Sequence, residues 1–476
     1  MATANQGDAG TGKVWRGLGQ RMYITQQGSA GGANWSNCYR SRHYSNVPFR
    51  YFRVVLQTFE PGVAAPFTDT DFATSFVFQV GFEYPYVQGN SGIPARIPVT
   101  FNAANATGYS PATGPFEYVH SDNLVGYSPA TGPFGYILSD VIDAGQVIPA
   151  GAFFGFWTTQ ENAAGSASAS NSLPYYFNAT NYLERYEGYT LAASSLVAAN
   201  TALTASSITH VSAASQAGLA EGVTPSMILI ECDPDDKSVL MVGDSITYGV
   251  GEGVAGSGTN PNAYGDALGS VLSNAGYPAR LLNEKFGYNT VNFGRGSDRL
   301  QYASANNWKY RLQMAALANP THIVQQNLIN DITSGSSFAT LKTNLGAVYA
   351  LLRGACPNIP IIQTTATPQA ATTDAYVTTT NQTAGTGCGG PGSVRGQIND
   401  YIRSLRSTVN GYNYLDTAPI LEDGYVSGIP GGATSLWNVT GVADGYTYDG
   451  THPNSYADNL VANGLNGENP VRQMDY

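Results

Sequence analysis

The chain has 476 residues, a formal net charge of −11 and only 12% charged residues, with 55 glycines and 31 tyrosines. This length predicts two or three domains rather than one core. The acidic balance argues against nucleic acid as a partner, because phosphate binding needs a basic face. The aromatic, glycine-rich composition is typical of a rigid, loop-rich protein rather than a disordered one.

Residues 1–235 are predicted to form an antiparallel β-sandwich of the jelly-roll kind, ending in a linker. β-Branched and aromatic runs occur at 51–56, 76–80 and 95–101, and Gly, Pro, Asn and Asp clusters separate them. Short, regularly spaced strands with turn signals are typical of sandwiches and jelly rolls. Residues 1–12 lack the apolar centre of a secretory signal peptide, and no apolar run approaches the length of a membrane span. A virion-associated or cytoplasmic location is therefore expected rather than Sec secretion.

An 18-residue tandem repeat interrupts the β-rich half, with its copies beginning at Gly108 and Gly126. Two copies are too few for a solenoid, which needs about three or more. The repeat is interpreted as a duplicated loop or hairpin. Either it is a tolerated surface insertion, or it offers tyrosines to a sugar or a partner.

At residue 236 the pattern changes to an alternation of strands and helices, which continues to residue 476. This alternation predicts a parallel sheet covered by helices on both faces. In such sheets, ligands bind outside the carboxyl ends of the strands. The strands are expected at 238–242, 291–293, 322–326 and 359–364, and the helices at 263–274, 308–318, 338–352 and 394–405.

The first of these strands delivers Gly243-Asp244-Ser245 to the end of the sheet. A serine hydroxyl is a poor nucleophile unless a base accepts its proton. The chain has five histidines, and His452 is the one in a polar loop near the C-terminus, three residues after Asp449. A tight turn there would let Asp449 hold Nδ1–H of the imidazole and leave Nε2 to face Ser245.

An ester-cleaving site also needs donors for the developing oxyanion. The backbone N–H of Ser245 is one candidate. Gly294 follows the second strand and Asn330 follows the third, so both are expected at the same edge of the sheet. The sequence contains neither a Gly-x-Ser-x-Gly elbow nor a His-Glu-x-x-His metal motif, which disfavours an α/β-hydrolase or a metalloenzyme.

These blocks together resemble the SGNH (GDSL-type) hydrolase superfamily over about residues 237–476. The resemblance implies a flavodoxin-like three-layer α/β domain and ester hydrolysis without metal or cofactor. It implies that Ser245 is the nucleophile, that His452 and Asp449 complete a triad, and that a second-block glycine N–H and Asn330 serve the oxyanion. Leu328 stands where the third block normally begins with glycine. The second-block donor is assigned to Gly294, with Gly296 or Ser297 as alternatives.

Removal of O-acetyl groups from a polysaccharide is the favoured function, because the sandwich also resembles accessory domains of carbohydrate esterases. A lipase or general esterase on small acyl esters is one alternative. A structural or adhesive virion protein, such as a phage tail or fibre that binds glycans, is the other. The expected partner is an acylated polysaccharide or another ester, and a homo-oligomer or virion assembly stays open.

Three smaller features keep two interpretations each. Arg295 and Arg299 either bind acidic sugars or pack against the surface and the sheet. The Thr/Gly-rich segment 368–392 either forms a lid or does not. The four cysteines form no Cys-x-x-Cys pair, so metal binding is not expected. Cys356 and Cys388 either pair or, as preferred, stay free and buried like the others.

Overall fold

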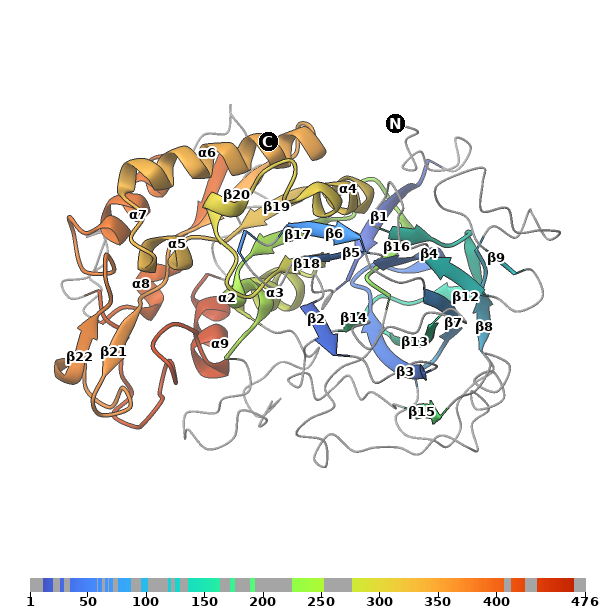
Figure 1. The fold of residues 1–476 in the computed structure, drawn as a ribbon, viewed down its shortest axis with the longest axis horizontal. Coiled ribbons are helices and arrows are strands. Elements are labelled where there is room, and N and C mark those ends of the chain that lie inside the picture. The colour runs from blue at the N-terminus through green and yellow to red at the C-terminus, as the bar shows by residue number, and fades with distance from the viewer. Residues whose placement is uncertain are drawn as a thin grey trace. The chain divides into compact units, whose positions relative to one another are not determined.

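The structure is a computed structural model of the whole chain, and it divides into two compact units (Figure 1). Residues 1–236 and 308–319 form the first unit, and residues 237–307 and 320–476 form the second. The structure describes residues 12–19, 26–29, 35–57, 59–61, 65–66, 68–71, 76–86, 96–101, 119–120, 125–128, 136–162, 172–175, 189–192, 225–251, 276–405, 412–423 and 435–465. The helix expected at 263–274, most of the tandem repeat and most of the linker lie outside these residues.

The first unit contains two antiparallel sheets, which confirms the predicted class of fold. One sheet has the order β1 (Val14–Leu18), β16 (Met227–Cys232), β4 (Phe49–Gln57), β11 (Tyr136–Leu138), with β12 (Ile142–Ile148) also paired to β4. The other has the order β15 (Tyr189–Ala192), β3 (Trp35–Tyr44), β13 (Phe153–Asn162), β7 (Phe76–Glu83), β10 (Val125–Ser128), β9 (Val119–His120), with β8 (Ile97–Val99) beside β7. Two further pairs join β2 (Gln26–Ser29) to β14 (Ser172–Tyr175) and β5 (Phe59–Pro61) to β6 (Asp69–Asp71).

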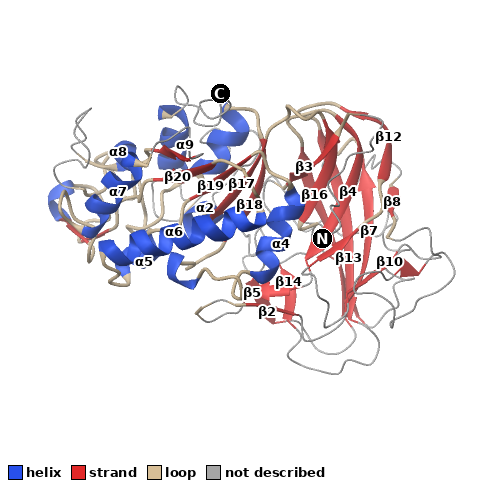
Figure 2. Cartoon of the chain, turned by 90° about the horizontal axis from the view of Figure 1, so that it is seen from above, coloured by secondary structure: helices blue, strands red, loops and turns tan. Residues whose placement is uncertain are grey.

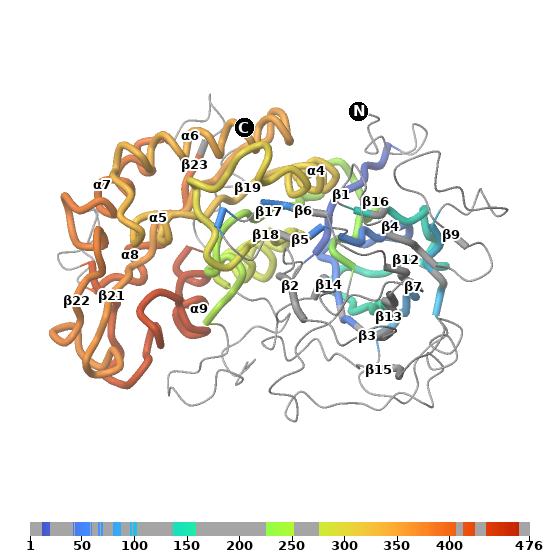
Figure 3. The backbone as a smooth tube through the Cα atoms, viewed as in Figure 1, coloured from blue at the N-terminus to red at the C-terminus, as the bar shows by residue number. Residues whose placement is uncertain are grey.

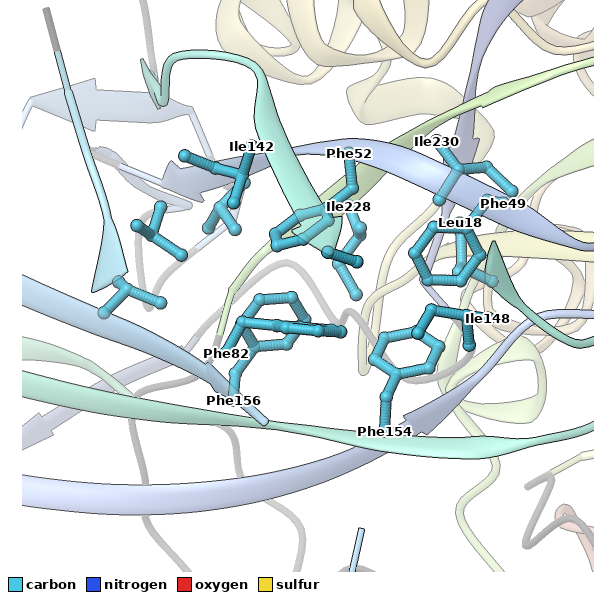
Figure 4. Packing of buried hydrophobic residues seen from close by; sticks show 14 of the residues in the cluster. Leu18, Phe49, Phe52, Phe82, Ile142, Ile148, Phe154, Phe156, Ile228 and Ile230 are labelled. Atoms are coloured by element: carbon cyan, nitrogen blue, oxygen red, sulfur yellow. The ribbon is translucent and has the colours of Figure 1, made fainter. Parts of the chain in front are cut away.

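The core of this unit is an aromatic and aliphatic cluster fed by both sheets (Figure 4). Phe52 of β4 lies 4.6 Å, centroid to centroid, from Phe82 of β7, and both side chains are buried. Phe154 and Phe156 of β13 join the same cluster at alternate positions along their strand. Alternation with a period of two places one side of each strand in the core, which is why the β-branched and aromatic runs were readable as strands.

Helix α4 (Lys309–Ala318) forms where the sequence predicts a helix, but it packs with the first unit. The carboxylate of Asp69, in β6, accepts hydrogen bonds from the backbone N–H groups of Tyr310 and Arg311 at 3.1 and 3.0 Å. Its other oxygen accepts Nε–H of Arg311 at 2.8 Å, and both side chains of this ion pair are buried. Asp69 thus caps a helix that lies 241 residues later in the chain.

The second unit is built on a parallel sheet, again as predicted, and this sheet has a fifth strand, 412–415, that was not among those expected. Its order is β18 (Asn289–Gly294), β17 (Ser238–Gly243), β19 (His322–Gln325), β20 (Ile361–Thr364), β23 (Tyr412–Leu415). Helix α6 (Phe338–Ala355) covers one face and α9 (Ser455–Gly464) covers the other (Figure 2). The other described elements of the unit are α2 (Ser245–Tyr248), α3 (Tyr277–Ala279), η4 (Arg280–Lys285), η5 (Leu300–Tyr302), α5 (Ile329–Thr333), β21 (Ala370–Thr372), η6 (Thr379–Asn381), β22 (Gln382–Ala384), α7 (Val394–Ser404) and α8 (Ala418–Leu421).

The carboxyl ends of three strands meet at one edge of this sheet. Gly243 of β17 is in register with Gly294 of β18, and Val242 is in register with Gln325 of β19. Every residue of these three strands is buried. The loops that carry the predicted site residues therefore leave the sheet side by side.

Cys356 and Cys388 are buried and free, so no disulfide joins them.

Candidate active site

The nucleophile turn, residues 243–247, joins β17 to α2. Asp244 caps the helix, and its side chain accepts the N–H of Ile246 at 2.9 Å. Ser245 is the first helical residue and is 7% exposed. A Cβ atom on Gly243 would lie 1.9 Å from Oγ1 of Thr247, so the turn can close on itself only with glycine at this position.

The acid–base turn, residues 447–453, presents His452 to this serine. A β-bridge between Thr447 and Pro453 closes the turn. One oxygen of Asp449 accepts the backbone N–H groups of Thr451 and His452, both at 2.9 Å. Its other oxygen lies 2.6 Å from Nδ1 of His452, and Nε2 of His452 lies 2.7 Å from Oγ of Ser245.

The protonation states follow from the charge of Asp449. Burial opposes its ionisation, but the hydrogen bonds and positive charge that His452 can offer outweigh burial and lower the pKa of Asp449. An ionised carboxylate only accepts hydrogen bonds, so Nδ1 of His452 carries the proton. Nε2 is then free to accept the proton of Ser245. Ser245 and His452, which lie 207 positions apart in the sequence, are thus brought together as the sequence predicts.

Two buried amide side chains that the sequence analysis overlooked hold the nucleophile turn. Oε1 of Gln326, directly after β19, accepts Oγ1–H of Thr247 at 2.7 Å and N–H of Thr247 at 3.2 Å. From the opposite side, Nδ2 of Asn292 in β18 donates to the carbonyl of Thr247 at 2.8 Å. Their signal in the sequence was a polar residue at the end of an apolar strand, on both neighbours of β17.

The placement of Gly294 corrects the choice of oxyanion donor. Its N–H donates to Oδ1 of Asn292 at 2.8 Å, so that N–H is already used. A Cβ atom there would lie 2.4 Å from the backbone nitrogen of Tyr248, which explains the glycine by packing. The remaining candidates for the second-block oxyanion donor are Gly296 and Ser297. Ser297 has φ = 63°, a left-handed conformation that favours glycine.

Asn330 and Asp331, at the start of α5, organise the same loop. Nδ2 of Asn330 donates to the carbonyl of Asp298 at 3.1 Å, which places this amide beside the loop that contains Ser297. The carboxylate of Asp331 accepts the N–H groups of Leu300 and Gln301 at 2.8 and 3.1 Å. Burial raises the pKa of Asp331 to about 6.

The two arginines of this loop differ in exposure. Arg295 is 1% exposed and donates to the carbonyl of Gly296 at 2.9 Å, which makes it a packing residue rather than a sugar ligand. Arg299 is partly exposed, with its guanidinium 5.3 Å from the ring centroid of Tyr302. Among the residues that the structure describes, no group of three His, Cys, Asp or Glu side chains could hold a metal ion. Nor is any described helix long and apolar enough to cross a membrane.

A parallel sheet with a serine at the end of β17, faced by an Asp-x-x-His turn, is consistent with an SGNH-type hydrolase domain. Residues 241–457 match the family model for the GDSL-like Lipase/Acylhydrolase family. The match therefore identifies a GDSL-like lipase/acylhydrolase domain at these residues, which confirms the resemblance found in the C-terminal half of the sequence.

Comparison with solved structures gives distant likenesses. A family two carbohydrate esterase from Cellvibrio japonicus matches with a TM-score of 0.34 and 11% identity, covering 97% of this chain and 95% of that chain. A mutant of an acetyl-xylooligosaccharide esterase from Geobacillus Stearmophilus has a TM-score of 0.30, 13% identity, and coverage of 50% and 94%. A member of the lipolytic protein G-D-S-L family from Veillonella parvula has a TM-score of 0.28, 14% identity, and coverage of 49% and 97%. No curated protein matches the sequence.

Proposed function

We propose that the second unit hydrolyses carboxylic esters by two-step acyl transfer. The observation that carries this proposal is the hydrogen-bonded row from Oγ of Ser245 through the imidazole of His452 to Asp449, with spacings of 2.7 and 2.6 Å. A base within this distance can take the hydroxyl proton as the serine attacks. The third group keeps the imidazole in the required tautomer.

The reaction balances through these groups alone. Oγ of Ser245 bonds to the ester carbonyl carbon while its proton moves to Nε2 of His452. The tetrahedral intermediate then breaks the bond to the alcohol oxygen, and His452 returns the proton to the leaving alcohol. Water next attacks the acyl-serine and gives a proton to His452, which passes it back to Ser245 as the carboxylic acid leaves.

For the oxyanion we propose the N–H of Ser245, the N–H of Ser297 and the amide of Asn330. Only one of the two Nδ2 protons of Asn330 is needed for the bond to Asp298. Ser297 adjoins Asp298 and takes the left-handed conformation at 63°, which supports it over Gly294. Donors fixed before the reaction stabilise the developing charge without reorganising during it.

For the substrate we propose an O-acetyl group on a polysaccharide. Tyr448 supports a sugar ligand, because its side chain is 37% exposed and its ring stacks on the imidazole of His452 at 6.4 Å and 18°. An exposed aromatic ring beside the base can cover the apolar face of a pyranose. The antiparallel unit that precedes the hydrolase domain is the proposed polymer-binding part.

The test compares wild type with Ser245→Ala on p-nitrophenyl acetate, butyrate and octanoate, and on acetylated xylan and acetylated bacterial capsule. Acid release should fall roughly 10³-fold or more in the variant, which is the size of triad effects. Acetyl preference with release from a polymer supports the deacetylase. A preference for octanoate would contradict it and favour a lipase. No release by wild type from any of these substrates, together with unchanged glycan binding by the variant, would sink the enzyme proposal.

A further inference from the structure

The segment 368–392 is an ordered hairpin rather than an open loop. Strands β21 and β22 pair antiparallel from Ala370 with Ala384 to Thr372 with Gln382. The turn between them closes around the carboxylate of Asp374. This carboxylate accepts Oγ1–H of Thr372 and of Thr378 at 2.7 Å, and Nδ2–H of Asn381 at 2.9 Å. These side-chain bonds, those from Thr378 and Asn381 foremost, hold the pKa of Asp374 well below its usual value.

Hairpin β21–β22 lies beside the red C-terminal segment that leads into α9 (Figure 3). It contacts the acid–base turn of that segment at Gly450, between Asp449 and His452. The N–H of Ala370 donates to the carbonyl of Gly450 at 3.0 Å, and the Tyr376 hydroxyl donates to the carbonyl of Ala370 at 2.9 Å. Gly450 has φ = 79°. A Cβ atom there would lie 1.8 Å from the carbonyl oxygen of Ala370 and 2.1 Å from the Tyr376 hydroxyl. The contact is therefore too close for any residue except glycine.

A second arm reaches the same carbonyl through Trp437. The side-chain amide of Gln382, in β22, pairs with the backbone of Trp437 in both directions, at 2.9 and 3.0 Å. The indole Nε1–H of Trp437 then donates to the carbonyl of Gly450 at 2.8 Å. Trp437 is fully buried. One carbonyl oxygen in the middle of the Asp449–His452 turn thus accepts two hydrogen bonds, and both come from the hairpin or from a residue that the hairpin holds.

We infer that hairpin β21–β22 and Trp437 form a brace that sets the position of the acid–base turn, with Tyr376, Gln382 and Trp437 as positioning residues. The brace contributes no group to the reacting atoms. It fixes the backbone from which the imidazole reaches Ser245, and a misplacement of about 1 Å at a catalytic group can cost about 10²-fold in rate. The expected loss of rate without the brace rests on the proposed ester hydrolysis, whereas the expected loosening of the acid–base turn does not.

Trp437→Phe tests the brace by removing Nε1–H while keeping an aromatic ring. Hydrogen–deuterium exchange of a peptide covering 446–454 measures the turn directly, because the backbone N–H groups of Gly450, Thr451 and His452 donate to side chains within it. Exchange should become roughly fivefold to tenfold faster, as expected for the loss of one buried hydrogen bond. In ester hydrolysis, kcat should fall about tenfold with KM unchanged.

Trp308→Phe is the matched control, since Trp308 is 2% exposed and its Nε1 meets no acceptor among the described residues. This control should leave both readouts at wild-type values. Gln382→Met is a second variant, in case Trp437→Phe does not fold, and it removes both bonds to the Trp437 backbone.

The readouts separate the possible failures. Unchanged exchange in both Trp437→Phe and Gln382→Met would overturn the brace, whatever the kinetics. Faster exchange with wild-type kcat would overturn its positioning role. If wild type hydrolyses no ester, the proposed function fails, and the exchange result still decides whether the brace exists.

Discussion

The nucleophile turn and the acid–base turn are held in different ways. Side chains from the two strands beside β17, Asn292 and Gln326, hold the serine. The histidine lies on a loop, and hydrogen bonds from Ala370 and Trp437 to one backbone carbonyl support that loop. The serine is thus placed by the regular sheet of the family. The histidine is placed by contacts between segments that no regular pattern connects.

The carboxyl groups of the two turns also differ in charge preference. Burial raises the pKa of Asp244, next to the nucleophile, to about 7. In the acid–base turn, the pKa of Asp449 is lowered by His452 in spite of burial, and the neighbouring hairpin lowers that of Asp374. Acid should therefore weaken the acid–base turn and its brace, whereas a rise in pH from about 4 to about 7 should weaken the nucleophile turn.

Gly450→Ala is expected to have the largest effect and to act on the acid–base turn. The new methyl group would collide with the carbonyl oxygen of Ala370, 1.8 Å away, so the backbone must move. We expect kcat to fall about 10²-fold, because the imidazole moves with the backbone. Steady-state kinetics on p-nitrophenyl acetate, with thermal unfolding in parallel, measures this.

Gly441→Ala separates collision from backbone strain. Gly441 has φ = 80°, against 79° for Gly450, but a Cβ atom there meets nothing within 4 Å. Both variants carry the strain of a left-handed alanine, of order 1 kcal/mol. Equal losses of kcat in the two variants would show that strain, and not the brace contact, explains the result.

The sequence allowed more of the nucleophile side than of the acid–base side to be predicted. Alternating strands and helices placed β17, β18 and β19, and a parallel sheet then requires their carboxyl ends to meet. Asp449 and His452 were found because a three-residue spacing can close locally. Nothing local linked Trp437 to Gly450 or Asp69 to α4, since such contacts depend on tertiary packing.

The error at Gly294 has the same origin. A glycine after a strand offers a backbone N–H, but the sequence does not say whether a side chain already accepts it. Here Asn292, two residues earlier, accepts that N–H at 2.8 Å. The left-handed conformation of Ser297 favours it as the donor, but the sequence does not reveal that conformation, because serine does not require it.

Gln326→Met should have the next largest effect and acts on the nucleophile turn. The change keeps the length of the side chain but removes the oxygen that accepts N–H and Oγ1–H of Thr247. The same oxygen also accepts the backbone N–H of Asp244 at 3.4 Å, so three buried donors would lose their acceptor, at a cost of about 1–3 kcal/mol each. We expect kcat to fall roughly tenfold to 10²-fold with KM little changed, measured by the same kinetics.

Gln325→Met is the control for Gln326→Met. Gln325 is the neighbouring glutamine, it is fully buried, and its amide donates to Asn327 at 3.0 Å rather than to the nucleophile turn. Gln325→Met should lower the unfolding temperature, because it removes a buried side-chain hydrogen bond, but its kcat should stay close to the wild-type value. If the two glutamines prove interchangeable in their effect on kcat, the serine is not held by Gln326.

Asp244→Asn should have the smallest effect on activity, and its effect on stability should depend on pH. The asparagine oxygen can still accept N–H of Ile246, the bond that caps α2. In wild type, the folded pKa of about 7 exceeds the ordinary value of 3.8. Between these values the folded chain holds a proton that the unfolded chain has released, so stability present at low pH is lost as pH rises towards 7. The loss is at most about 4 kcal/mol, at 1.36 kcal/mol per pKa unit.

Asparagine does not titrate, so the free energy of unfolding of Asp244→Asn should rise steadily relative to that of wild type between pH 4 and pH 7, as urea unfolding would measure.

Asp374→Asn should show a pH dependence of the opposite sign. Because the folded pKa of Asp374 is lowered, its contribution is present above about 3.8 and is lost as pH falls below that value. Wild type should therefore lose its advantage over Asp374→Asn only in acid. If the free energy of unfolding depends on pH in the same way in wild type and both variants, the proposed electrostatic difference between the two turns is wrong. The two turns would then differ only in how neighbouring segments hold them.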